Sequence, residues 1–191
     1  MKVSRTELLD LIVLEPRIFI DQRGHFLEVF QAERYLEYGI PERFVQDNLS
    51  LSMKGVVRGL HYQLGRPQGK LVGVIQGTVF DVAVDIRYGS PTFGRYAGII
   101  LSSENYRQIY IPEGFAHGFC VLSDAAIVLY KCTDYYVPEE ERGIRWDDPS
   151  LNIAWPVQSP VLSEKDRTYP SLSDMAMDQL PRFAAGKDAV T

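Results

Sequence analysis

The sequence contains only two cysteines and three histidines among its 191 residues. Cys120 and Cys132 both lie inside apolar runs, which favours buried, reduced thiols over a disulfide, although the sequence alone leaves the disulfide open. A chain with so few cysteines has no disulfide framework to stabilise it. Its length is well above the size at which a core becomes hard to build, so we expect its stability to come from a packed core.

The sequence also lacks an excess of positive charge. It has 20 Lys and Arg against 25 Asp and Glu, a formal net charge of −5. Proteins that bind nucleic acid without sequence preference need a basic surface, so we expect no nucleic-acid partner. An anionic ligand would require cations gathered at one site rather than spread over the surface.

Long hydrophobic runs are missing as well. The N-terminal run from Leu8 to Leu14 is interrupted by Asp10 and ends at Glu15-Pro16. It is too short and too acidic for a signal peptide or a membrane span, so we expect no membrane partner and a location in the cytoplasm. The length fits one domain covering residues 1–191, in which the last dozen residues are expected to be frayed.

Short strands dominate what is present. Eight to ten apolar or alternating segments occur at regular spacing with turn residues between them, and no βαβ rhythm is visible. This pattern predicts an all-β barrel or jelly roll. Residues 11–14 and 17–20 are expected to form an opening strand pair, and residues 69–76 and 78–87 a hairpin around Gln76-Gly77. Residues 31–38 and 163–169 are the expected helical segments.

The stretch from Val56 to Lys70 concentrates chemically active side chains. Arg58, His61 and Lys70 lie within it, flanked by β-branched residues that predict strands on both sides. A histidine can exchange a proton near neutral pH, and the two cations suit an anionic ligand or a developing oxyanion. Taken alone, the stretch fits equally well a half-buried strand with solvated charges.

A second polar pattern occurs between residues 44 and 50. Gln46, Asn48 and Ser50 occupy every second position and therefore share one face of a predicted strand. Amides at this spacing can bind a sugar or the edge of a base. A solvent-exposed sheet face explains the pattern equally well.

The segment Pro112-Glu113-Gly114-Phe115-Ala116-His117 resembles the second half of the cupin signature, PxGxxH. Metal-binding cupins need a first half with two histidines one residue apart. Here the corresponding residues are His61 and Gln63, and an amide is a poor substitute for imidazole in a transition-metal site. With His25 the only other histidine, we expect no metal.

A longer set of motifs resembles the dTDP-4-dehydrorhamnose 3,5-epimerase family over residues 10 to 170, in a consistent order. The matching segments are Arg58-Gly59-Leu60-His61, Pro67 to Val72, Val79 to Arg87, Ser90 to Gly94, Ile111 to Phe119, Leu129-Tyr130-Lys131 and Tyr135-Tyr136. One departure is Gly69, where the resemblance leads us to expect alanine; glycine should loosen this loop.

The resemblance implies a cupin-type double-stranded β-helix, or jelly-roll barrel, with a few short helices. It also implies a homodimer, no cofactor and a dTDP-linked 4-keto-6-deoxy sugar as substrate. It places the catalytic base at His61, the acid at Tyr130 and the aspartate that supports the base at Asp166, within Ser163-Glu164-Lys165-Asp166. Substrate-contacting positions transfer to Arg23, Glu28, Gln46, Asn48, Arg58, Lys70, His117, Glu141 and Lys165.

These residue types suit the implied chemistry. Epimerisation next to a ketone removes a proton and returns one to the opposite face of the carbon. Histidine paired with a carboxylate supplies a base near neutral pH, and Lys70 is the natural group to stabilise the enolate oxygen. A tyrosine on a facing strand can act as the acid, and Arg23 and Arg58 suit the diphosphate.

Three other functions compete with the 3,5-epimerase. A related enzyme could invert only C3 or only C5, and nothing in the chain excludes this. A metal-dependent cupin oxygenase conflicts with Gln63. A non-catalytic nucleotide-sugar binding protein could do without a base or an acid, yet His61 and Tyr130 are both present.

Overall fold

The computed structural model describes residues 1–41 and 43–184, which contain thirteen strands and only short helices. All strand pairs within the sheets are antiparallel, so the predicted all-β class is confirmed. The expected count of eight to ten strands was too low, partly because the short strands β1 (Lys2–Arg5) and β13 (Glu141–Gly143) carry little sequence pattern.

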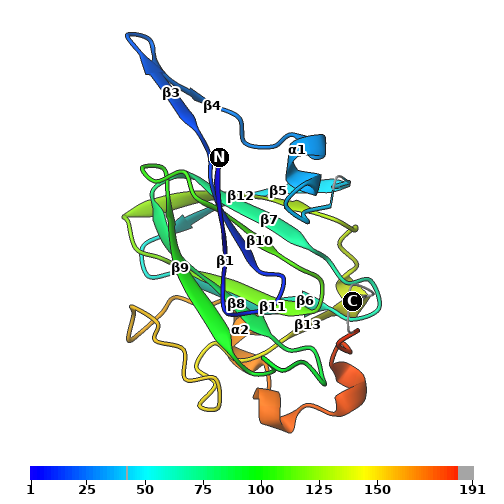
Figure 1. Cartoon of the computed structure of the whole chain (residues 1–191). Helices are drawn as coiled ribbons and strands as arrows, with labels where there is room; N and C mark the ends of the chain where they lie inside the picture. The colour runs from blue at the N-terminus through cyan, green and yellow to red at the C-terminus, as the bar shows by residue number, and fades with distance from the viewer. Residues whose placement is uncertain (42, 185–191) are drawn as a thin grey trace.

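Two sheets form the body of the molecule (Figure 1). The six-stranded sheet has the order β1, β2 (Ile12–Glu15), β10 (Gln108–Ile111), β7 (Lys70–Gln76), β12 (Ala125–Cys132) and β5 (Gln46–Met53). The five-stranded sheet has the order β13, β6 (Val57–Gln63), β11 (Phe115–Val121), β8 (Thr78–Asp85) and β9 (Tyr96–Ser102).

The main core lies between the two sheets and is built from the alternate apolar residues of their strands. Its buried members include Val72 and Val74 on β7, Val79 on β8, and Phe115 and Phe119 on β11. Strand alternation places every second side chain on this inner face, which is why the period-two pattern could be recognised in the sequence.

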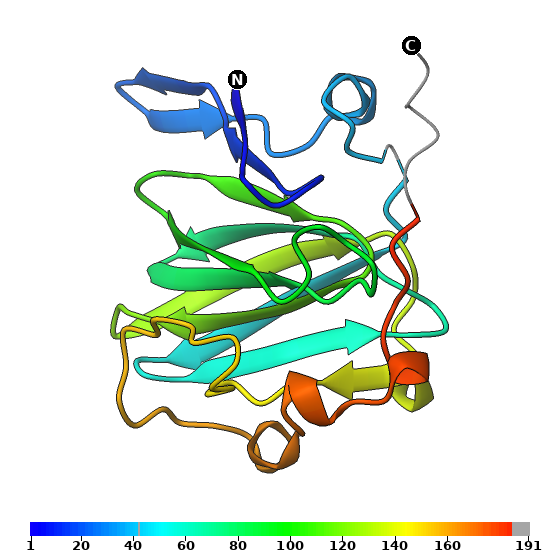
Figure 2. The same ribbon diagram turned by 60° about the horizontal axis from the view of Figure 1, so that its bottom comes forward.

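A second layer covers the outer face of the five-stranded sheet. The chain after β13 runs along this face, as Figure 2 shows, and buries Ile144, Leu151 and Leu172 against Leu60 and Val84 of the sheet. All seven residues of β11 are consequently buried, because both faces of the strand are covered. This layer contains α2 (Glu164–Thr168), which lies within the predicted helical segment 163–169, together with short 3-10 turns at Leu172–Asp174 and Met177–Gln179. A further 3-10 turn, Pro138–Glu140, comes just before β13.

The expected hairpin around Gln76-Gly77 is wrong, although both of its strands exist. β7 pairs with β10 and β12, whereas β8 pairs with β11 and β9, so the two strands belong to different sheets. Gly77 has φ +81°, and a Cβ there would lie 2.2 Å from the carbonyl oxygen of Ala125. The Gln76-Gly77 step is therefore a corner between sheets rather than a hairpin turn.

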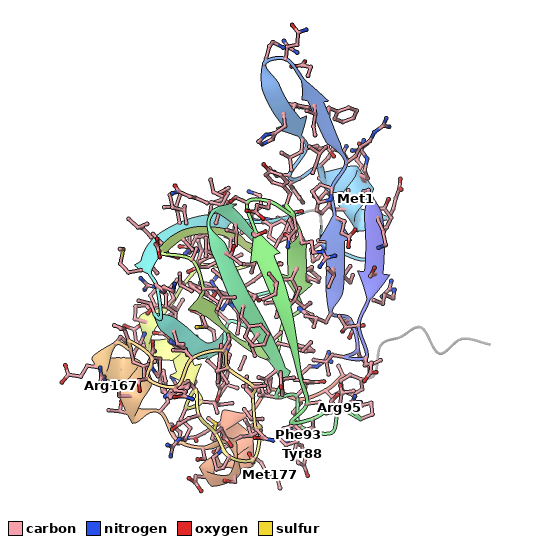
Figure 3. All side chains as sticks on the ribbon, turned by 90° about the vertical axis from the view of Figure 1, so that its left-hand side faces the viewer. Met1, Tyr88, Phe93, Arg95, Arg167 and Met177 are labelled. Carbon is pink, nitrogen blue, oxygen red and sulfur yellow. The ribbon has the colours of Figure 1, made fainter. Side chains whose placement is uncertain are left out.

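The expected opening strand pair is also wrong. β2 pairs with β1 and β10, while β3 (Ile18–Asp21) pairs with β4 (Gly24–Leu27). The β3–β4 hairpin projects beyond the two sheets (Figures 1 and 3), and Ile20 and Phe26 on it are exposed. The predicted helix 31–38 is present as the shorter α1 (Ala32–Leu36), for which the Gln31 side chain serves as N-cap.

The end of the described chain is anchored rather than frayed. Leu180 is buried, Arg182 forms an isolated bridge with Tyr88, and the Phe183 amide donates to the Tyr88 carbonyl. The rest of the segment expected to be frayed, residues 185–191, lies outside the described residues. Within the described ranges, no helix combines the length and the apolar character that crossing a membrane requires.

Candidate active site

A cavity of about 340 Å³ opens at one end of the barrel between the two sheets. Both sheets contribute to its wall: β5 and β12 from the six-stranded sheet, and β6 and β11 from the five-stranded sheet. Eight of the twelve site residues predicted from the sequence line it, namely Gln46, Asn48, Arg58, His61, Lys70, His117, Tyr130 and Glu141.

His61 and Asp166 form the first functional pair of this site. Nε2 of His61 lies 2.6 Å from Oδ1 of Asp166, which is buried on α2. The Asp166 amide in turn donates to Oγ of the N-cap residue Ser163, which fixes the start of the helix. Because the carboxylate accepts from Nε2–H, Nδ1 of a neutral His61 ring carries the free lone pair.

The charge of Asp166 is set by two opposing effects. Burial alone would raise the pKa of this carboxyl, but its hydrogen bonds from His61 and Ser163, together with the positive charge of a protonated His61, outweigh burial and hold the pKa below its usual value. Asp166 is therefore ionised at neutral pH and can both orient the imidazole and stabilise its protonated form.

A β-bulge in β6 directs Arg58 and His61 into the same cavity. On β11, His117 pairs with His61 and Phe119 pairs with Arg58, so three steps on β6 oppose two on β11. In a regular strand, residues three apart face opposite sides; the extra residue removes this conflict. Gly59 within the bulge has φ +118°, and a Cβ there would lie 2.6 Å from the Gly118 Cα.

Tyr130 and Lys70 lie on the wall opposite His61. Tyr130 is on β12 and Lys70 on the neighbouring β7, both in the six-stranded sheet. Burial raises the pKa of the Tyr130 phenol, so this group is protonated at neutral pH. Burial lowers the pKa of Lys70, partly opposed by the negative charges of Asp81 and Glu141 and of a deprotonated Cys132. The Tyr130 phenol and the Lys70 amine, both hydrogen-bond donors, therefore face the base across the cavity.

His117 forms a second imidazole–carboxylate pair that the sequence analysis did not anticipate. Its Nε2 lies 2.9 Å from Oδ2 of Asp81, a fully buried residue of β8. Oδ1 of Asp81 has no hydrogen-bond partner among the described residues. The available signal was a carboxylate on the face of β8 that also bears Val79 and Ala83, because a charge on a core face needs a buried partner.

Glu141 connects the rim of the cavity to α2. Its Oε2 accepts from Tyr136 Oη at 2.8 Å and from Lys165 Nζ at 2.6 Å. Burial raises the pKa of Glu141, but these two hydrogen bonds and the charges of His61 and Lys165 lower it further than burial raises it. Lys165 itself does not line the cavity; it touches the site through Glu141.

Arg23 and Glu28 lie away from the cavity of their own chain. The Arg23 side chain is 90% exposed at the tip of the β3–β4 hairpin, where it bonds to Asp21. Glu28 forms an ion pair with Arg34 of α1. Neither residue is among those that line the cavity.

Gly69, the one local departure noted in the motifs, is held on both sides. Its amide donates to Thr133 Oγ1 at 2.8 Å, and its carbonyl accepts from the Thr133 amide at 3.0 Å. A Cβ at this position would lie 2.9 Å from Tyr110 Oη. Glycine therefore gives the backbone room here, within a segment that is tied to Thr133.

The three histidines do not converge on a metal. His25 lies outside the cavity, where its Nε2 is 3.0 Å from Tyr106 Oη. Residues 1–41 and 43–184 contain no group of three or more His, Cys, Asp or Glu side chains able to hold a metal ion. Both cysteines are buried and free in the structure, as expected for thiols inside apolar strands.

Comparison with known proteins gives consistent matches. A family profile described as dTDP-4-dehydrorhamnose 3,5-epimerase matches residues 5–174. A Shigella flexneri protein of the same description is 57% identical over 168 residues, which span 87% of this chain and 93% of the relative.

Solved structures also resemble the chain. The dTDP-6-deoxy-D-glucose-3,5-epimerase of Legionella pneumophila, solved in complex with dTDP-4-keto-L-rhamnose, superimposes with a TM-score of 0.93 at 56% identity; the match covers 96% of this chain and 99% of that one. A 3′-monoepimerase from Streptomyces bikiniensis, in complex with dTDP-quinovose, is 33% identical with a TM-score of 0.87, covering 93% of this chain and 91% of that one. These likenesses confirm the predicted cupin-type barrel.

Proposed function

Because the chain belongs to the dTDP-4-dehydrorhamnose 3,5-epimerase family, we propose that His61 and Tyr130 exchange protons with opposite faces of its substrate. The protein is an isomerase that acts in dTDP-rhamnose biosynthesis. It epimerises C3 and C5 of dTDP-4-dehydro-6-deoxy-D-glucose to give dTDP-4-dehydro-L-rhamnose. The observation that carries the proposed roles is the placement of His61 and Tyr130 on facing sheets of one cavity.

In the proposed reaction, Nδ1 of His61 removes a proton from the carbon next to the C4 ketone. The electron pair moves into an enolate, and Asp166 stabilises the imidazolium that forms. Lys70 donates a hydrogen bond to the enolate oxygen, which carries the developing charge. Tyr130 then delivers its proton to the opposite face of the same carbon, which inverts its configuration.

The remaining lining residues supply binding. Arg58 is fixed by a 2.9 Å hydrogen bond from its Nε to Ser52 Oγ, which leaves its terminal nitrogens for the diphosphate. Gln46 and Asn48 are hydrogen-bonded to one another on β5, and each amide still has an N–H group and a lone pair that no other described residue engages and that could meet the sugar or the base. His117, supported by Asp81, completes the polar wall.

Turnover in deuterated buffer tests this function against its alternatives. Two solvent deuteriums, one at C3 and one at C5, are expected in the product. A single deuterium would indicate an epimerase of one carbon, as in the Streptomyces relative named above. Binding of the nucleotide sugar without any deuterium uptake would indicate a non-catalytic binding protein.

We further propose that the reaction needs no metal and no cofactor. Gln63 stands where a metal-binding cupin needs its second histidine, and both ends of its amide are engaged by backbone groups. Activity should therefore survive dialysis against a chelator. A requirement for stoichiometric iron, zinc or manganese would overturn this proposal.

We propose a homodimer in which the β3–β4 hairpin of one protomer reaches the cavity of the other. Two features support it. β5 is an edge strand whose outer face exposes Leu49, Leu51 and Met53, an apolar surface typical of an interface. In addition, Arg23 and Glu28, the two predicted substrate-contacting residues on or next to this hairpin, do not line the cavity of their own chain.

Mixed dimers show whether Arg23 acts on the cavity of its own chain or on that of the partner. Co-expressed Arg23→Ala and His61→Ala chains form one intact site only if Arg23 acts on the partner's cavity; if it acts in its own chain, both sites are defective. We expect activity to recover in the mixed dimer and light scattering to give about twice the 21.7 kDa chain mass. A monomer, or no recovery in the mixture, would contradict the proposal.

We also assign the protein to the cytoplasm. The two free, buried cysteines support this assignment, since a reducing compartment leaves such thiols unpaired. Imaging of a tagged full-length chain, with fractionation as the check, tests it.

A further inference from the structure

Gln63 lines the cavity but has no role in the proposed mechanism. It lies at the end of β6 and is buried, yet its side chain makes three hydrogen bonds to backbone groups outside its strand. Nε2 donates to the carbonyl of Arg66 at 2.7 Å and to the carbonyl of Tyr135 at 3.1 Å, and Oε1 accepts from the amide of Val137 at 2.7 Å.

Two of these bonds bracket Tyr136, whose side chain lines the cavity and is half exposed. The Tyr136 amide is itself held from the six-stranded sheet, by a 2.8 Å hydrogen bond to Oε1 of Gln46. Its hydroxyl donates to Glu141, the residue paired with Gln63 on β13. The chain from residue 135 to 137 has no strand or helix of its own, so side-chain bonds fix its position.

We infer that Gln63 is a positioning residue that fixes Tyr136 at the rim of the cavity and so determines the affinity for the nucleotide sugar. The inference rests on the proposed function, whose substrate Tyr136 would meet. A primary amide suits the task because two donors and one acceptor are needed on one short side chain. Imidazole offers at most one of each when neutral, and a carboxylate offers no donor.

Direct binding of substrate by Gln63 is the competing explanation, since its side chain also borders the cavity. Both N–H groups are already used, and only one lone pair of Oε1 remains without a partner. The amide therefore has little capacity left for a ligand. A contribution through Tyr136 and a direct contribution predict different behaviour in a double-mutant cycle.

The experiment compares Gln63→Glu, Tyr136→Ala and the double variant. Gln63→Glu keeps the shape of the side chain but replaces both donors with acceptors that face two carbonyls. Gln158→Glu, an exposed position outside the cavity, controls for the added charge. The measurements are the Kd for dTDP by calorimetry, the KM and kcat for the keto sugar nucleotide, the pH profile of kcat, and the melting temperature.

For Gln63→Glu we expect Kd and KM to rise about tenfold or more, kcat to stay within about threefold, and its pH profile to be unchanged, since His61 and Asp166 are untouched. The double variant should bind no more weakly than the weaker single variant. A lower melting temperature with unchanged Kd and KM would overturn the inference. It would also be overturned if the increase in Kd in the double variant equalled the product of the increases in the two single variants.

Two provisions keep the test decisive. If Gln63→Glu fails to fold, Gln63→Asn retains the amide but shortens the side chain by one methylene, so it cannot span the same three partners. If the wild-type chain binds dTDP but does not turn over the keto sugar, the proposed function fails. The cycle measured on the Kd for dTDP still decides the role of Gln63 in that case.

Discussion

His61 and His117 are direct cross-strand partners on β6 and β11, and each imidazole bonds through Nε2 to a buried aspartate. The two pairs differ in access: the side chain of His61 is 25% exposed and that of His117 only 8%. A base must present a free ring nitrogen to its substrate. We therefore assign proton abstraction to His61 and a binding role to His117.

Removal of the base should stop the chemistry at both carbons. His61→Ala is expected to abolish deuterium uptake at C3 and at C5, because one imidazole serves both positions. Asp166→Asn should keep the fold but lower turnover by roughly 10²–10⁴-fold, since the amide can neither hold the imidazole as an ionic partner nor stabilise its charge. NMR of the product from deuterated buffer measures both effects. Full exchange in His61→Ala would place the base elsewhere.

Tyr130→Phe should separate proton exchange from inversion. The variant leaves His61 and Lys70 intact, so a proton can still be removed, but the enolate is then reprotonated from the face it left or slowly by water. The ratio of solvent exchange to inversion should rise well above that of the wild type. If Tyr130 only packs in the barrel, the variant would lose roughly 1 kcal/mol of stability and the ratio would not change.

The bulge in β6 should be sensitive to a single methyl group. At Gly59 a Cβ would meet both a positive φ and the backbone of β11, at 2.6 Å from the Gly118 Cα. Gly59→Ala should therefore displace Arg58 and His61 and reduce kcat/KM by about tenfold or more. Gly89→Ala is the matched control, because Gly89 also has positive φ but open space around it. Equal losses of kcat/KM in the two variants would show that backbone strain at positive φ, and not the close approach of Gly59 to Gly118, causes the loss.

Asp85 should stabilise the fold at neutral pH and lose this effect in acid. Burial would raise its pKa, but hydrogen bonds from Arg87, Ser90 and Thr92 lower it below the usual value of 3.8. A carboxyl with a lowered folded-state pKa stabilises the protein above its unfolded-state pKa, and this contribution is lost as pH falls through the folded-state value.

Asp85→Asn should accordingly lower the free energy of unfolding by about 3 kcal/mol at pH 7, because it leaves the Arg87 guanidinium buried without its main partner. The difference from wild type should shrink below pH 4. Urea denaturation across this range measures it, with the exposed Asp178→Asn as control. If the difference in unfolding free energy between wild type and variant does not change with pH, the charge of the Asp85 carboxylate is not what stabilises its contacts with Arg87, Ser90 and Thr92.

The sequence by itself determined the all-β class, the positions of β7 and β8 and the residue types of the site. Strand alternation is a local property: it depends only on which face of one strand is buried, so β8 could be recognised from its own residues. The short, contiguous motifs around His61, His117 and Tyr130 likewise identified the residues of the site. Ser163 marked the start of α2 because a helix N-cap is also a local signal.

The tertiary structure decided everything that depends on partners far apart in the chain. His61 and Asp166 are 105 residues apart in sequence, and Asp81 acquires its role only because β8 pairs with β11. The corner at Gly77 sends β7 and β8 to different sheets, whereas turn chemistry alone predicts a hairpin. The bulge turns Arg58 toward the face of His61, against the simple period of two. Pairing, register and bulges are set by which strands bury a common core, and no local pattern contains that information.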